Sequence, residues 1–176
     1  LMECPLQRDA RGRYTMDLAA VEQALKTGAK LMLLCNPHNP VGRVWKREEI
    51  AKVAEICEKH GVFVISDEVH CDHIRKGQKY TPFLTVCADK GNAICLVGIN
   101  KSFNMAGLAC SNAVVQDKGL YEKIMESYHM PMPTPFAIAG HIAAFTEGDE
   151  WMDQVCEYIE GNIDACIGFF QAELPW

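Results

Sequence analysis

Apolar and polar positions alternate along the chain on two different scales, which indicate strands and helices in turn. Almost continuous apolar runs of strand length occupy 30–35, 62–66 and 93–98, and a shorter run lies at 111–115. Apolar runs of this length are typical of strands buried on both faces of a sheet. Between the runs, apolar residues recur every three or four positions, as on one face of a helix. This spacing predicts helices over 17–27, 46–59, 118–128, 135–146 and 150–173, and a short helix over 82–88.

Residues with strong local preferences mark the boundaries of these elements. Asp17 can cap the first helix through its carboxylate, and Gly28 ends that helix. A loop is expected at 36–42, because two prolines and a glycine interrupt the segment. Strands that alternate with helices predict an α/β fold, a three-layer α/β/α arrangement with a mostly parallel sheet. Right-handed crossovers then bring the carboxyl ends of the strands to one edge, where ligands bind in such folds.

Composition and charge exclude several classes of protein. The 176 residues are enough for one domain, and the net charge of -6 argues against a nucleic-acid-binding surface. No apolar stretch approaches the roughly 18 residues of a membrane span. The nine cysteines are scattered, include no C-x-x-C pair and often lie in apolar runs, so we expect reduced, mostly buried thiols. With no secretory signal at its start, the chain is expected to be cytoplasmic.

Three polar residues follow the first three predicted strands, namely Asn39, Asp67 and Lys101. They should converge at the ligand edge of the sheet, and together they match the needs of pyridoxal 5′-phosphate (PLP). A lysine amine forms an imine with the aldehyde of this cofactor. A carboxylate beside the pyridine nitrogen keeps that nitrogen protonated, and a side-chain amide can donate a hydrogen bond to the phenolate oxygen of the ring.

Three short motifs carry a resemblance to a known family. The segments Asn39–Gly42 (NPVG), Ser66–His70 (SDEVH) and Asn100–Leu108 (NKSFNMAGL) resemble, in order and spacing, the signatures of fold-type-I PLP enzymes of the class I/II aminotransferase superfamily. The sequences of Cys35–Trp45 and Phe103–Leu108 are most similar to the cystathionine β-lyase or C–S lyase branch. The resemblance covers most of the chain and implies the large PLP-binding domain of fold type I.

By this resemblance, Lys101 binds PLP and is also the acid–base group that removes the α-proton of the substrate. Asn39 donates to the phenolate oxygen of the ring, Asp67 pairs with the pyridinium nitrogen, and Val69 packs against one face of the ring. His70 stands where many relatives have a tyrosine that reaches the same phenolate oxygen.

The resemblance is incomplete on the phosphate side of the cofactor. Many members have an arginine eight residues after the lysine, where this chain has Ala109, although the absence of that arginine is familiar in the C–S lyase branch. A serine often precedes the lysine, where this chain has Asn100, and Gly98 lies three positions before the lysine. Asn100 and Ser102 are the remaining candidates for hydrogen bonds to the phosphate.

Members of the family are considerably longer than this chain. By the resemblance, residues 1–148 are part of the PLP-binding large domain, and residues 149–176 form a long helix that leads toward a small domain. The segments without a counterpart here carry a phosphate-binding turn, an aromatic ring that stacks on the cofactor and the arginine that binds the substrate carboxylate. We therefore expect a fragment, or a truncated product, of a homodimeric enzyme whose subunits share the active site.

The resemblance implies α,β-elimination on a sulfur-containing amino acid such as cystathionine, with release of a thiol, pyruvate and ammonia. An aminotransferase is an open alternative, because it would use the same lysine, aspartate and asparagine. Arg43 and Trp45, together with Phe103 and Asn104, favour the lyase. A third interpretation is a catalytically incomplete domain that keeps the fold without the cofactor.

Two further features have competing interpretations. The segment His70–His73 (HCDH) contains metal-ligand residue types, but its spacing fits a loop and no second cluster accompanies it, so no metal is expected. Trp45 either anchors its loop to the following helix or contributes to a substrate pocket.

Overall fold

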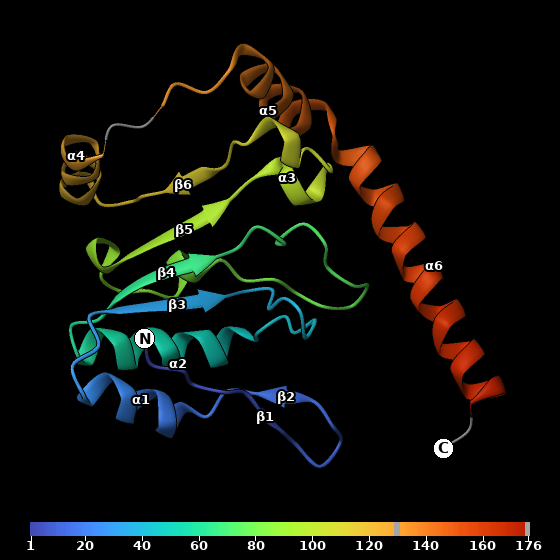
Figure 1. Ribbon diagram of the computed structural model, residues 1–176, viewed down its shortest axis with the longest axis horizontal. Helices are drawn as coiled ribbons and strands as arrows, with labels where there is room; N and C mark the ends of the chain where they lie inside the picture. The colour runs from blue at the N-terminus through green and yellow to red at the C-terminus, as the bar shows by residue number, and fades with distance from the viewer. Residues whose placement is uncertain (129–130, 175–176) are drawn as a thin grey trace.

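The computed structural model describes residues 1–128 and 131–174, and a four-stranded sheet lies at its centre (Figure 1). The strands follow chain order across this sheet: β3 (Leu31–Cys35), β4 (Phe63–Asp67), β5 (Ala93–Val97) and β6 (Asn112–Val114). A small hairpin of β1 (Gln7–Arg8) and β2 (Tyr14–Thr15) precedes the sheet. The expected α/β class with a mostly parallel sheet is confirmed.

The first three strands are parallel, whereas β6 runs antiparallel to β5. The carboxyl ends of β3, β4 and β5 therefore share one edge as expected, but the expectation that every strand ends there is wrong for β6. The reason lies in the connection from β5, which contains only the one-turn helix α3 (Ile99–Ser102) and the 3-10 turn η3 (Ala106–Leu108). This connection has no helix that could cross a face of the sheet. The chain therefore turns back at the carboxyl end of β5, and β6 starts there and runs in the opposite direction.

The helices agree closely with the pattern of apolar residues. Asp17 caps the first of them by accepting a hydrogen bond from the amide of Ala20 at 3.0 Å. The predicted helix at 82–88 is wrong in type and length, because only the 3-10 turn η1 (Phe83–Thr85) forms there. The remaining elements are α1 (Leu18–Lys26), α2 (Arg47–Lys59), η2 (Lys90–Asn92), α4 (Lys118–Ser127), α5 (Pro135–Glu147) and α6 (Asp149–Glu173).

The hydrophobic core lies between α1, α2 and one face of the sheet. Ile50 and Val53 of α2 are fully buried and belong to the same cluster as Val64 of β4 and Cys95 of β5. On β3 the opposite face is open, where Leu33 is 70% exposed. The expected burial on both faces is therefore wrong for β3 within the described residues.

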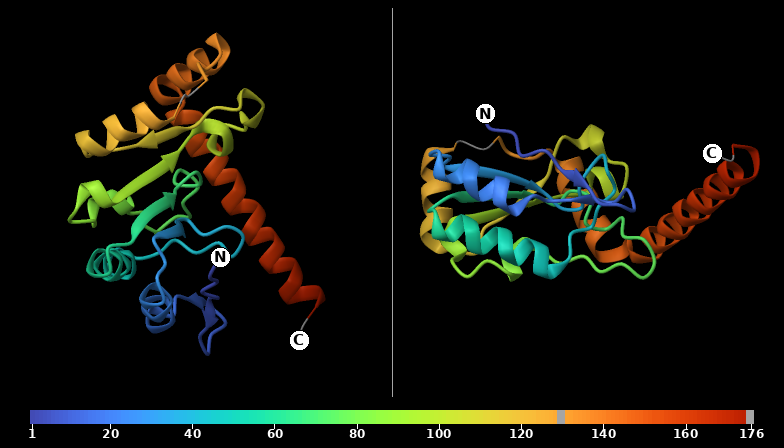
Figure 2. Two further views of the ribbon diagram at one scale, coloured as in Figure 1. Left: turned by 60° about the vertical axis from the view of Figure 1, so that its left-hand side comes forward. Right: turned by 90° about the horizontal axis from the view of Figure 1, so that it is seen from below.

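Helix α6 stands clear of the sheet in Figure 1 and in the right-hand view of Figure 2. It contacts the loop after β4 through Arg75, whose guanidinium donates to both carboxylate oxygens of Glu160, at 2.9 and 2.6 Å. Arg75 also lies 3.7 Å from Asp164. Across the described part of the chain, α6 included, we find no helix both long and apolar enough to cross a membrane.

All nine cysteines are free thiols. Burial is the main cause that raises the pKa of Cys57 and of Cys95 to about 12, so both behave as protonated, apolar core groups. Cys87 is the third fully buried thiol, while four others are partly buried and two are exposed. The expectation of mostly buried thiols therefore holds only for part of the set.

Candidate functional site

The carboxyl edge of the sheet gathers three of the predicted site residues. In the strand register, Cys35 of β3 lies beside Asp67 of β4, which lies beside Leu96 of β5. Asp67 is the last residue of β4 and is exposed. Asn39 lies in the loop after β3, and Lys101 lies on α3, just after β5. The parallel strands thus bring an amide, a carboxylate and an amine to one edge.

Buried hydrogen bonds shape the loop that carries Asn39. The side chain of Asn36 is fully buried, where it accepts from the amide of Trp45 at 3.2 Å and donates to the carbonyl of Thr81 at 3.2 Å. The indole N–H of Trp45 donates to the carbonyl of Cys35 at 2.9 Å, and the ring is fully buried. These contacts favour the interpretation of Trp45 as an anchor of the loop over a substrate contact.

Asn39 and His70 come together across a cleft at this edge. Asn39 Nδ2 lies 3.5 Å from His70 Nε2. The cleft has a volume of about 490 Å³ and lies between the loops 37–44 and 70–78 and helix α6. Burial lowers the pKa of His38 and His73, which also line the cleft, and the neighbouring His70 lowers the pKa of His73 further. Both imidazoles are therefore mostly neutral at pH 7.

The cleft does not include Asp67, Val69 or Lys101, so among the predicted residues it joins only Asn39 and His70. Asp67 Oδ1 accepts from the amide of Val69 at 3.2 Å, which turns the chain just after β4. Within the described residues, no donor contacts the other carboxylate oxygen of Asp67. An exposed carboxylate with one free oxygen is suited to pair with a cation at the sheet edge.

Sequence reasoning missed Glu68, the residue that follows Asp67. Its side chain is 1% exposed, and Oε1 accepts from the Ser66 hydroxyl and from the amide of Phe83, both at 2.8 Å. Oε2 accepts from the hydroxyl of Tyr80. Burial and this bond raise the pKa of Tyr80, so the phenol stays a protonated donor. The only sign of this role in the sequence is an acidic residue directly after a buried strand. Its partners Tyr80 and Phe83 are 12 and 15 positions away, so a local pattern does not reveal them.

Lys101 lies on the exposed side of α3, whose other side is buried. Ile99 and Ser102 are each 1% exposed, whereas Lys101 is exposed. The Ser102 hydroxyl donates to Asp72 Oδ2 at 2.5 Å, so its hydrogen is already engaged by the loop after β4. Asn100 is half-buried, and its Oδ1 has no hydrogen-bond partner among residues 1–128 and 131–174.

Close packing explains the glycine near the phosphate side of the predicted site. A Cβ at Gly98 would lie 3.1 Å from the Cβ of Ser111 and 3.2 Å from Asn100 Oδ1, so a larger residue would displace the start of β6. Ala109 has φ 48°, in the left-handed region, and its methyl group offers no charge to a phosphate. Of the two predicted side-chain donors, the amide of Asn100 remains available, because the hydrogen of the Ser102 hydroxyl is donated to Asp72.

The chemistry of this donor set fits PLP, since an exposed amine, a carboxylate with a free oxygen and a side-chain amide lie at one edge of one sheet. The same region offers no arrangement for a metal. In the part of the chain that the structure describes, no three His, Cys, Asp or Glu side chains are grouped to hold a metal ion. The rings of His70 and His73 lie 6.3 Å apart, centre to centre.

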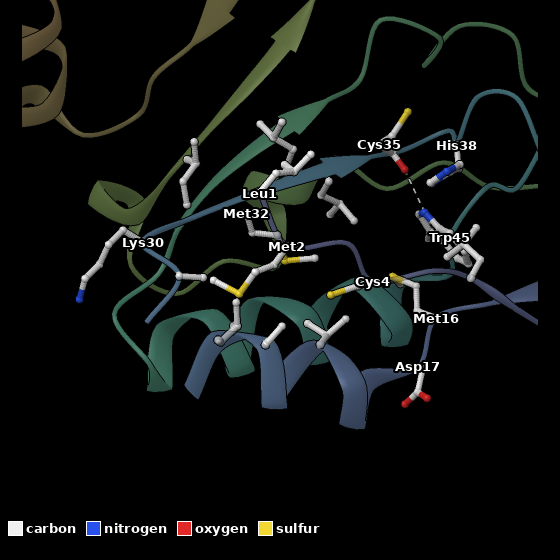
Figure 3. A pocket seen from close by; sticks show the side chains of 18 residues that line it. Leu1, Met2, Cys4, Met16, Asp17, Lys30, Met32, Cys35, His38 and Trp45 are labelled. Atoms are coloured by element: carbon white, nitrogen blue, oxygen red, sulfur yellow. Dashed lines mark hydrogen bonds between the residues drawn. The ribbon is translucent and has the colours of Figure 1, made fainter. Parts of the chain in front are cut away.

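A second hollow, with a volume of about 550 Å³, lies between the N-terminal segment, α1 and β3 (Figure 3). Side chains of Met2, Cys4 and Met16 point into it from three separate positions along the chain. Its lining is mainly apolar, and it includes Trp45 but none of the predicted cofactor-binding residues. The groups suited to cofactor chemistry are therefore at the sheet edge and not in the larger hollow.

Comparison with known proteins agrees with this geometry. The family model for aminotransferase class I and II matches residues 2–175, and the chain belongs to this family. Cystathionine beta-lyase PatB of Bacillus subtilis (strain 168) is 36% identical over 97% of the chain, and protein MalY of Escherichia coli (strain K12) is 31% identical over 99%. The PLP-bound C–S lyase from Staphylococcus hominis superposes with a TM-score of 0.91 at 35% identity and covers 98% of the chain.

These relatives confirm both the family and the C–S lyase branch that the motifs indicated. The fold of the chain is that of the matching part of a fold-type-I PLP enzyme. The chain spans 45% of the length of PatB, of MalY and of the Staphylococcus structure. This chain therefore corresponds to less than half of each of these relatives.

Proposed function

We propose that the chain is the cofactor-binding core of a PLP-dependent C–S lyase that acts on sulfur-containing amino acids such as cystathionine. The observation that carries this proposal is the position of Asn39, Asp67 and Lys101 at or just after the carboxyl ends of three neighbouring parallel strands. The relatives support it, because PatB is a cystathionine beta-lyase and the Staphylococcus protein is a PLP-bound C–S lyase.

Each predicted residue has a distinct task in this proposal. PLP, when bound, supplies an electron sink for the negative charge left at the substrate α-carbon. Lys101 would hold PLP through its amine and, when that amine is free, would accept the α-proton of the substrate. Asp67 balances the charge of the pyridinium nitrogen, and Asn39 donates to the phenolate oxygen with His70 beside it. Val69 packs against the ring.

Two predicted side chains lie on the phosphate side of the site. We assign the phosphate to Asn100 and Ser102, as the motif suggests, but the two side chains are not equally available. The Ser102 hydroxyl hydrogen is donated to Asp72. Asn100 Oδ1 is buried close to Gly98, and the NH₂ of the same side chain is the donor that a phosphate oxygen would need.

The proposed reaction balances without any oxidant or reductant. The electron pair from the α-carbon–hydrogen bond forms a double bond to the β-carbon while the β-carbon–sulfur bond breaks and the thiolate leaves. The thiolate takes up a proton, and water hydrolyses the remaining unsaturated amine to pyruvate and ammonia. An S-substituted cysteine and water therefore give a thiol, pyruvate and ammonia.

Two alternatives rest on specific observations. The family model covers aminotransferases as well, and they would use the same lysine, aspartate and asparagine. The second alternative is a catalytically incomplete domain, which is supported by the fact that the chain spans 45% of the length of PatB and of MalY. The experiments below separate these alternatives from the lyase.

The organisation around the site is also part of the proposal. Residues 1–148 would form the cofactor-binding core and residues 149–176 the helix that leads to a further domain; the last two of these residues lie outside the described part. The whole protein would be a cytoplasmic homodimer that binds amino-acid substrates and neither nucleic acid nor membrane. The net charge of -6 supports the absence of a nucleic-acid surface.

The cofactor assignment is tested by adding PLP to the purified 176-residue chain and recording the visible absorbance before and after borohydride. We expect a visible band that borohydride abolishes, with PLP fixed covalently to Lys101 by peptide mass spectrometry. Lys101→Ala should lose the band. Lys76→Ala is the matched control, because Lys76 is an exposed lysine of the neighbouring loop, and it should keep the band. Labelling spread evenly over surface lysines would refute the assignment.

The reaction is tested on the whole protein with an S-substituted cysteine in the absence of any keto acid. Release of thiol and pyruvate in equal amounts supports the lyase. Turnover that requires a keto acid, with no free thiol, identifies an aminotransferase instead. A chain that folds but binds no PLP supports the incomplete domain.

A further inference from the structure

A helix of one turn is not stable by itself, yet α3 carries the lysine on which the proposed chemistry depends. The turn is closed by the bond from the amide of Phe103 to the carbonyl of Ile99, at 2.9 Å. Forming a first helical turn in isolation is unfavourable, because several dihedral angles are fixed for one hydrogen bond. Contacts with the rest of the molecule must therefore hold α3 in place.

Two side chains of α3 make these contacts. Ile99 and Ser102 are three positions apart, so they share one face of the turn, and both are almost completely buried. The contact of Ile99 is apolar and has no preferred direction. Ser102 is fixed by a directional bond, from its hydroxyl to Asp72 Oδ2 at 2.5 Å. Lys101 lies about 100° around the helix axis from Ser102, so its direction follows from this bond.

Asp72 belongs to the loop that begins at Asp67 and also carries His70. Two thiols hold it there as well: Cys71 Sγ donates to Asp72 Oδ1 at 3.6 Å, and Cys156 Sγ of α6 donates to the Asp72 carbonyl at 3.5 Å. The bond from Ser102 to Asp72 therefore joins the segment that follows β5 to the segment that follows β4.

We propose that Asp72 is a positioning residue, which orients α3, and with it Lys101, relative to Asp67 by accepting the hydrogen bond of Ser102. The purpose of this orientation rests on the proposed function, since the cofactor must reach the amine and the carboxylate at the same time. The proposal gives Ser102 a task that needs no contact with the phosphate.

The test measures α3 with and without the cofactor in the full 176-residue chain. In the absence of PLP, hydrogen exchange of the Phe103 amide reports the closure of the turn. We expect Ser102→Ala and Asp72→Ala to accelerate this exchange selectively while the melting temperature stays within the range of the control variant. With PLP, both variants should need roughly tenfold more cofactor for half-maximal formation of the borohydride-trapped Lys101 adduct.

Conservative variants distinguish orientation from general damage to the fold. Ser102→Thr keeps the hydroxyl and Asp72→Asn keeps an acceptor oxygen, so both should restore most of the adduct formation lost in the alanine variants. The double variant Asp72→Ala with Ser102→Ala should be no worse than either single variant, because both remove the same bond. Asp153→Ala, at an exposed aspartate of α6, is the control and should behave as the unmodified chain.

The outcomes separate this inference from the proposed function. Unchanged Phe103 exchange and unchanged adduct formation in both alanine variants would overturn the positioning role, while the cofactor assignment would stand. Faster exchange in these variants, in a chain that forms no adduct at Lys101 at all, would support the anchoring of α3 and refute the proposed function. Losses that the conservative variants fail to restore, accompanied by a lower melting temperature, would assign the pair to folding and overturn the proposal.

Discussion

Glu68 is the clearest case of one residue that holds several segments in place. A carboxylate removed from water is costly unless donors satisfy it. Here a hydroxyl from β4, a phenol from the loop before η1 and an amide of η1 all donate to it. Because Glu68 directly follows Asp67, the same bonds also hold the backbone of the proposed cofactor partner.

Removing this carboxylate should destabilise the fold strongly. Glu68→Ala leaves the donors of Ser66, Tyr80 and Phe83 without an acceptor, and we expect the free energy of unfolding to fall by about 3 kcal/mol. Glu68→Gln keeps one acceptor oxygen and should cost less. Denaturant titrations measure both, with Glu55→Ala at an exposed position of α2 as the control, expected within about 0.5 kcal/mol of the unmodified chain. Equal effects of Glu68→Ala and Glu55→Ala would contradict this role.

Residues with chemistry could be predicted where the signal is local. Asn39, Asp67 and Lys101 each follow an apolar run, and parallel strands share a carboxyl edge, so their common location follows from simple rules. The bond of Ser102 to Asp72 could not be predicted in this way. Its partners are 30 positions apart and depend on how two connections pack at that edge.

At the scale of elements, an ion-pair cluster joins α1 to the C-terminal end of α2. Glu22 Oε1 lies 2.7 Å from Lys59 Nζ and 3.1 Å from His60 Nε2. The hydrogen bond from Lys59, and then that from His60, lowers the pKa of Glu22 from its ordinary 4.5 to about 2. A carboxyl group with a lowered pKa stabilises the fold above its unfolded-state pKa and loses that contribution as the pH falls through the folded-state value.

The contact between these helices should therefore weaken between about pH 4.5 and pH 2. We expect Glu22→Gln to be less stable than the unmodified chain at pH 6, and we expect the difference to be much smaller at pH 2, by thermal denaturation at each pH. The difference should shrink in high salt, because the pair is at the surface. Glu126→Gln on α4 is the matched control and should follow the unmodified chain throughout. A stability gap between Glu22→Gln and the unmodified chain that does not change with pH would exclude the ion pair as its cause.

The spacing of apolar residues predicts which segments are helices and which are strands. It predicts the directions of the strands in the sheet only in part. The spacing of apolar residues is sufficient for α1, α2 and α6, which form with nearly the expected bounds. The direction of β6 was not predicted, because it depends on the connection after β5, which forms only the one-turn helix α3 and the turn η3 and no crossover helix. The pattern of apolar residues shows that β6 is a strand and does not show which way it runs.

At the scale of the whole molecule, much apolar surface faces solvent. One face of β3 is open, and α6 has no fully buried residue among those described. Phe136 and Phe145 of α5 are exposed as well. Apolar side chains that gather in one exposed patch mark sites of association or of aggregation. Relatives more than twice as long as this chain have additional segments that could cover such surfaces.

Two neighbouring leucines of β3 provide a direct test of this open face. Leu34 is 4% exposed and belongs to the core, whereas Leu33 is 70% exposed on the opposite face. Leu34→Ala should lower the free energy of unfolding by about 3 kcal/mol, because it removes buried methyl groups and leaves a cavity. Leu33→Ala should change it by less than about 0.5 kcal/mol and reduce the binding of an apolar fluorescent dye.

The two substitutions have the same chemistry in adjacent positions of one strand, so only the environments of the side chains can separate their effects. If the sheet face is open in solution, stability depends on Leu34 and dye binding on Leu33. If instead Leu33→Ala costs as much stability as Leu34→Ala, that face is covered in solution. The loss of stability caused by Leu33→Ala is then measured at several protein concentrations. A loss that depends on concentration identifies a second copy of the chain as the cover of this face, and a constant loss identifies another segment of the same chain.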